Sequence, residues 1–124
     1  MINSVVVQGN LVKDCVLLET KNGKPYTEGT LAIDEYYKQG NGYNKKVHYI
    51  DFAIFGLRVE GIVKRLIKGE LVTVQGQLNY RSWQSDDRRE AKVYINVAQI
   101  QTHGRNNDEY THGEYYEDVK SGII

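Results

Sequence analysis

Aromatic rings alternate with charged side chains at several points of the chain. Trp83 follows Arg81 by two residues, and Tyr49 and Phe55 flank Asp51 in another segment. Because residues two apart lie on the same side of a β-strand, each segment would present its rings on one face. Such rings can stack on the flat face of any nucleobase, and neighbouring cations can neutralise phosphates. This combination is typical of a surface for unpaired nucleic acid.

A third group of rings and cations surrounds the glycine-rich segment from Gln39 to Gly42. Tyr36 and Tyr37 precede this segment, and Tyr43 follows it. The cations close to it are Lys38, Lys45 and Lys46. Two adjacent strand residues face opposite sides, so at least one of the paired tyrosines should be exposed.

The elements that must position these groups are strands. Turn residues separate five stretches with strand character, at 4–12, 26–37, 46–55, 71–83 and 91–101. An apolar stripe at helical spacing predicts one helix between the third and fourth of them, formed by Val59, Ile62, Val63, Leu66 and Ile67. This order predicts an all-β OB-fold, a five-stranded barrel with one helix between strands 3 and 4. An SH3-like barrel is the competing architecture, and the helix placement favours the OB-fold.

Parity sorts the side chains of two strands into core and surface. In the fourth stretch, the predicted core positions are Val72, Val74, Gly76 and Leu78, and the opposite side carries Arg81 and Trp83. In the third stretch, Ile50, Phe52 and Ile54 form the apolar side. The outer side would then carry Tyr49, Asp51, Ala53 and Phe55.

Charge divides the 124-residue chain into two parts. Lys and Arg total 16, as do Asp and Glu, but residues 1–104 hold 14 basic and 11 acidic residues. Residues 105–124 hold 2 basic and 5 acidic residues and lack periodicity. We therefore expect one mildly basic barrel domain at 1–104 and a short acidic disordered tail at 105–124.

The number of cysteines and the hydropathy of the chain indicate the cellular compartment. The chain has one cysteine, Cys15, which we interpret as a small apolar filler, and it has no apolar run of membrane-spanning length. We expect a cytoplasmic protein that does not associate with membranes and binds neither a metal nor another cofactor.

Catalysis is not indicated by the residues. The chain shows no glycine-rich phosphate loop, and its three histidines are scattered. His48 shares the parity of Ile50 and Phe52, which favours a partly buried strand residue. The alternative to a DNA-binding role is an OB-fold protein-interaction or replication-restart module with secondary nucleic-acid binding. RNA also remains open, because stacking alone does not detect the 2′-hydroxyl.

Four segments in register resemble the bacterial and phage single-stranded-DNA-binding proteins. They are Asn3–Asp14, Thr30–Ile33, Tyr49–Gly56 and Lys68–Leu78, followed by Arg81 and Trp83. The resemblance covers about residues 1–103 and implies base stacking at Tyr37, Tyr49, Phe55 and Trp83. The predicted single-stranded-DNA site therefore comprises Tyr37, Tyr49, Phe55, Trp83, Arg81, Lys38, Lys45 and Lys46.

The same resemblance implies assembly and a biological role. Members are typically homotetramers whose first strands pair between subunits, with a homodimer as the alternative, and they protect unpaired DNA during replication, recombination and repair. Many members have tryptophan where this chain has Tyr37 and Tyr49. They often carry a basic residue at the position of Asp51, so phosphate attraction there is expected to be reduced, or replaced by a partner such as Arg81.

The end of the chain departs most from the family pattern. Members usually end in an acidic tip with terminal aromatics, which docks replication or repair proteins. Here the analogous residues are two carboxylates and two terminal aliphatics: Glu117, Asp118, Ile123 and Ile124.

Overall fold

The computed structural model describes residues 1–56 and 58–105. Strands make up most of this part of the chain, with one short α-helix (α1) and one 3-10 turn (η1). In chain order the elements are β1 (Val5–Leu11), β2 (Leu18–Glu19), β3 (Pro25–Gln39), β4 (Gly42–Phe55), α1 (Val59–Ile62), η1 (Val63–Arg65), β5 (Glu70–Ser85) and β6 (Arg88–Arg105).

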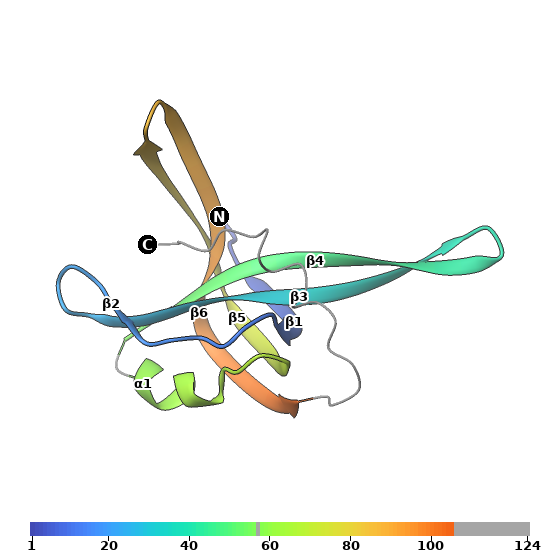
Figure 1. Ribbon diagram of the computed structural model, residues 1–124, viewed down its shortest axis with the longest axis horizontal. Helices are drawn as coiled ribbons and strands as arrows, with labels where there is room; N and C mark the ends of the chain where they lie inside the picture. Colours follow the sequence, from blue (N-terminus) through green and yellow to red (C-terminus); the bar gives the residue numbers. More distant parts are fainter. Residues whose placement is uncertain (57, 106–124) are drawn as a thin grey trace.

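The strands form a sheet that closes on itself (Figure 1). The strand order is β1-β5-β6-β4-β3-β2, and β1 also pairs with β3 at Asn10 and Leu11, which completes a ring of five strands. The strand pairs are antiparallel except β4 with β6, which run parallel at Phe52 and Ala53. This is the topology of an OB-fold barrel, so the predicted fold class is confirmed.

The predicted position of the helix between strands 3 and 4 is wrong. β2 was not predicted, because two residues are too few to show alternation, and the helical segment consequently follows β4. It is also shorter than its apolar stripe suggests, since a 3-10 turn begins at Val63. The stripe still packs against the barrel: Val59 and Leu66 are fully buried.

The core lies inside the ring of strands and against α1. Its largest fully buried side chains include Phe52, Leu11, Leu31, Ile54, Leu66 and Ile95. Cys15 is buried in the same cluster, and its burial raises the pKa of the thiol to about 12. The thiol is therefore protonated at neutral pH, as suits an apolar filler.

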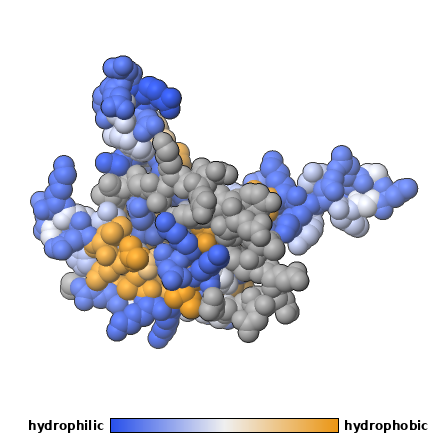
Figure 2. Space-filling model, viewed as in Figure 1, coloured by the Kyte–Doolittle hydropathy of each residue, from blue (hydrophilic) through white to orange (hydrophobic). Residues whose placement is uncertain are grey.

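The β3–β4 hairpin continues well beyond the barrel as a long arm (Figure 1). The two strands pair without interruption as far as Gln39 and Gly42, and Gly40 in the intervening turn has a φ of +60°. Every residue beyond Ile33 on β3, and every residue of β4 up to Lys46, is exposed. The predicted glycine-rich loop is thus a tight turn at the tip of this arm. Figure 2 shows that the outer parts of the arms are hydrophilic and that hydrophobic residues gather over the body.

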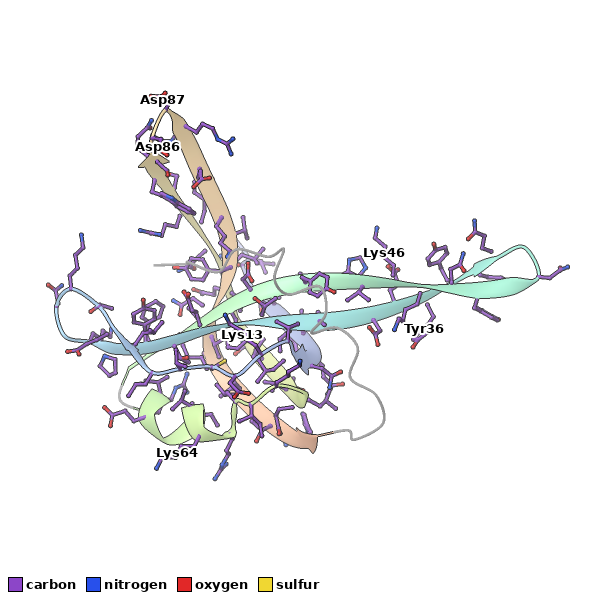
Figure 3. All side chains as sticks on the ribbon, viewed as in Figure 1. Lys13, Tyr36, Lys46, Lys64, Asp86 and Asp87 are labelled. Carbon is purple, nitrogen blue, oxygen red and sulfur yellow. The ribbon has the colours of Figure 1, made fainter. Side chains whose placement is uncertain are left out.

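The β5–β6 hairpin forms a second arm, with Asp86 and Asp87 at its tip (Figure 3). β1 pairs with β5 only as far as Gly76, where the register of β5 against β6 also shifts. The predicted core position of Leu78 is therefore wrong: this side chain is 47% exposed because β5 has already left the closed barrel.

We predict that Gly76→Ala destabilises the fold. A methyl group at position 76 would overlap the backbone carbonyl oxygen of Asn96 on β6. That atom belongs to a paired strand, so relief requires a backbone shift, and we expect the free energy of unfolding to fall by about 2–4 kcal/mol. Urea unfolding followed by circular dichroism measures the change.

Gly61→Ala is the matched control for this experiment. Gly61 lies in α1, and a methyl group there would meet no atom within 4 Å apart from its chain neighbours and the backbone of its own helix. Because alanine favours helix over glycine, this variant should gain up to about 1 kcal/mol. Equal effects of the two substitutions would contradict the packing argument.

Candidate functional site

The outer side of β3 and β4 carries the predicted rings. Alternation along β4 directs Tyr49, Asp51 and Phe55 away from the core that contains Phe52, and all three are partly exposed. Ala53 shares their side but is fully buried, because it packs with Tyr94 of β6 and with Phe55. We call this side of β3, β4 and β6 the outer face.

Phe55 has a ring partner that the sequence analysis missed. Its ring stacks on that of Tyr26, with centroids 5.5 Å apart and planes inclined by 20°. Burial and then the Glu28 carboxylate raise the pKa of Tyr26, whereas the nearby Arg81 guanidinium lowers it. Tyr26 has the parity of Thr30 on β3, and this signal could have placed it on the outer face.

Asp51 is the charged centre of the outer face. Its Oδ1 accepts a hydrogen bond from the Thr30 hydroxyl at 2.6 Å, and its Oδ2 lies 3.1 Å from the Lys92 ammonium. The sequence analysis named Arg81 as the cation near this carboxylate, and the structure adds an ion pair with Lys92. Both side chains of the pair are only 15% exposed, so it belongs to the packed surface. Lys92 was missed, although it shares the parity of Tyr94 on β6.

Trp83 lies on the β5–β6 arm and is partly exposed. The Arg81 guanidinium carbon lies 5.0 Å from the centre of its ring, a cation–π contact. Arg81 stands opposite Lys92 in the β5–β6 ladder, and Trp83 stands opposite Glu90. The two residues therefore share one side of the arm, and the Arg81–Lys92 pairing connects it to the outer face.

The remaining predicted residues lie along the β3–β4 arm, all of them exposed: Tyr37, Lys38, Lys45 and Lys46. Strand alternation puts Tyr36 on the side of the ribbon that also carries Lys38 and Lys45. Tyr37 and Lys46 lie on the other side. Figure 3 shows Tyr36 and Lys46 on opposite sides of the ribbon. Both tyrosines are exposed, at 66% for Tyr36 and 45% for Tyr37.

His48 and Glu35 form a pair on the β3–β4 arm. The His48 Nε2 lies 2.7 Å from a Glu35 carboxylate oxygen, and this hydrogen bond lowers the pKa of Glu35. His48 is partly exposed, as its parity suggested. The pair sits on the same side of the ribbon as Tyr37 and Lys46.

The structure thus brings one set of predicted residues together and leaves another apart. Tyr49, Phe55, Arg81 and Trp83 belong to the outer face and the adjoining arm. Tyr37 and the three lysines project along the other arm. The expected partner-docking residues Glu117, Asp118, Ile123 and Ile124, like the rest of the expected tail after Arg105, lie outside the described residues.

In 1–56 and 58–105, no group of three or more His, Cys, Asp and Glu side chains is arranged to hold a metal ion. In the same ranges, no helix is long and apolar enough to cross a bilayer.

The fold and the ring-bearing face define an OB-fold protein with a surface suited to stacking. Among solved structures, the chain resembles the Plasmodium falciparum SSB in complex with ssDNA, with a TM-score of 0.74. The two are 18% identical, and the match covers 84% of this chain and 96% of that one, which shows a shared fold.

Sequence comparison gives the family. The model of the single-strand binding protein family matches residues 2–103, and the chain belongs to this family. It is 34% identical over 96 residues to the single-stranded DNA-binding protein of Aquifex aeolicus, covering 77% of this chain and 65% of that protein. It is 31% identical over 103 residues to the protein of the same name from Treponema pallidum, covering 83% and 58%. The chain thus spans less than two thirds of the length of these two relatives.

Proposed function

We propose that this chain binds single-stranded DNA with little sequence preference. The observation that carries the proposal is the partial exposure of Tyr49, Phe55 and Trp83 on the outer face and the adjoining arm. Every base has a flat π-face, so a ring accepts any of the four, and each stack contributes about 1–3 kcal/mol. A duplex hides these faces within its own stack, which is why unpaired strands are the preferred ligand.

The exposed lysines of the β3–β4 arm supply the electrostatic part of binding. Lys38, Lys45 and Lys46 project from both sides of the ribbon, so the DNA backbone can be contacted along its length. Each phosphate that a cation neutralises releases condensed counterions, which makes affinity depend on salt. Lys92 is excluded from this role by its ion pair with Asp51.

The biological role follows from the family and this surface. We propose that the protein covers unpaired DNA during replication, recombination and repair in the cytoplasm, as a binding protein without a catalytic step. The competing function, an interaction module with secondary nucleic-acid binding, requires the same rings to be covered by a protein partner. RNA binding is distinguished by competition between oligo-rU and oligo-dT.

We predict that removing a stacking ring weakens binding while replacing it with another ring does not. Tyr49→Ala and Trp83→Ala should each cost about 1–3 kcal/mol of binding free energy, measured by anisotropy of a labelled oligo-dT. Tyr49→Phe and Trp83→Phe keep a ring and should lie within about threefold of the parent affinity. Thermal melts control for folding. No binding by the unmodified chain at low salt would refute the proposal.

We predict that the arm lysines set the salt dependence. Lys46→Ala should reduce the slope of log affinity against log salt by about 0.7, the contribution of one phosphate contact on a single strand. Lys64→Ala is the control, because Lys64 lies in η1 on a different side of the body from the arm (Figure 3). The same loss of slope in both variants would indicate a nonspecific charge effect.

We propose further that the protein assembles as a homotetramer, with a homodimer as the alternative, through β1. Within the described chain, β1 pairs with β5 along Val5 to Asn10 and touches β3 only at its end. Its opposite edge at Val5 to Gly9 is available to a strand of a second copy, and the side chain of Val6 is 66% exposed.

We predict a mass in solution of about four times the 14.2 kDa chain, or twice that of the chain for the dimer. Sedimentation equilibrium measures it. Val6→Glu places a charge at the proposed contact and should shift the mass toward that of one chain, whereas Lys64→Glu should not. A single-chain mass for the parent protein would refute the assembly.

A further inference from the structure

Asp51 occupies a position where a carboxylate should disfavour DNA. It lies between Tyr49 and Phe55 on the outer face, which a phosphate backbone must approach. Its two oxygens are nevertheless held from two other strands, by the Thr30 hydroxyl of β3 at 2.6 Å and by the Lys92 ammonium of β6 at 3.1 Å. Thr30 is 2% exposed and the ion pair 15% exposed, so these contacts are built into the barrel wall.

The Asp51–Lys92 contact reinforces a weak point of the ring of strands. β4 and β6 pair only at Phe52 and Ala53, whereas β3 and β4 pair along their full shared length. Asp51 immediately precedes that short pairing, and Lys92 lies three residues before its β6 partner Ile95. The ion pair therefore fastens the root of the β5–β6 arm to β4.

Lys92 also faces a second cation. Arg81 is its direct partner in the β5–β6 ladder, and like charges directly opposite one another repel. The Asp51 carboxylate offsets this repulsion from the Lys92 side. Arg81 can then stay near the ring of Trp83, at 5.0 Å from its centre. Side-chain contacts thus join Thr30, Asp51 and Lys92, and the ladder position of Lys92 opposite Arg81 relates them to the cation–π contact with Trp83.

We propose that Asp51 is a positioning residue for DNA binding: by holding Lys92 opposite Arg81, it fixes the β5–β6 arm so that the ring of Trp83 is set for stacking. This inference rests on the proposed function, since it concerns the same ring. It assigns Lys92 a structural charge and gives the carboxylate a favourable role on a DNA-binding face.

The proposal predicts a change in DNA affinity opposite to the change that charge alone would cause. Asp51→Asn keeps an acceptor for the Thr30 hydroxyl but makes the outer face more positive by one charge. Charge alone would then tighten DNA binding and steepen its salt dependence. Loss of positioning instead weakens oligo-dT binding, by about fivefold, because the ring must be ordered when the base arrives.

The free protein provides an independent readout, because Trp83 is its one tryptophan. In Asp51→Asn we expect lower fluorescence anisotropy of Trp83 and stronger quenching by acrylamide, with a folded circular dichroism spectrum. Asp87→Asn is the matched control: it adds the same charge at the tip of the same arm, away from the ion pair (Figure 3). It should change neither the Trp83 signal nor the affinity by more than about twofold.

The charge-swapped double variant, Asp51→Lys with Lys92→Asp, completes the experiment. It restores an ion pair with the same net charge, and we expect oligo-dT affinity and Trp83 anisotropy to return to within about twofold of the parent. If Asp51→Asn fails to fold, the double variant still tests whether the ion pair positions Trp83. Binding by Asp51→Asn as tight as or tighter than the parent, or an unchanged Trp83 signal, would overturn the proposal. Absence of binding by the parent would refute the proposed function alone, because the Trp83 signal still tests positioning.

Discussion

One side of β4 packs in the barrel core and the other side is partly exposed to solvent, because successive side chains of a strand point in opposite directions. Phe52 and Ile54 fill the barrel interior, while Asp51 and Phe55, on either side of this segment, belong to the outer face. The packing that stabilises the fold therefore also fixes the direction of the ring on the other side. Groups carried on paired strands are held more firmly than groups on loops, so the outer face is formed before any ligand arrives.

The charges of the molecule are divided between structural and exposed groups. Lys92 and Asp51 are mostly covered and joined to each other, whereas Lys38, Lys45 and Lys46 extend into solvent. The equal totals of acidic and basic residues do not show this division. A nearly neutral body with cations on a projecting arm suits a protein that attracts a polyanion without strong attraction at every face.

The sequence predicted much of the fold because alternation and turn residues are local signals. It placed Phe52 and Ile54 inside and Trp83 on the opposite side from the core positions of β5. It could not predict β2, which has two residues, or the exposure of Leu78, which depends on where β5 leaves β1. Two side-chain contacts were also not predicted: the stacking of Tyr26 on Phe55 and the ion pair of Asp51 with Lys92. Both join strands whose register the sequence does not specify. The lengths of the arms were underestimated for a related reason: outside the barrel, their polar sequences carry no core periodicity.

The rings of the outer face and Trp83 differ from those of the β3–β4 arm in the conformational entropy that they would lose on binding a base. Phe55 is already stacked on Tyr26, and Trp83 is in contact with Arg81, so both have given up rotational freedom in the free protein. Tyr36 and Tyr37 are exposed on a ribbon that makes no contribution to the core, and ordering them on a base costs more conformational entropy. In the proposed binding mode, the outer face would therefore provide the larger net free energy per stacked base, and the β3–β4 arm would mainly provide reach and charge. Binding should accordingly begin with phosphate contacts along the arm and become tight only when bases reach the outer face.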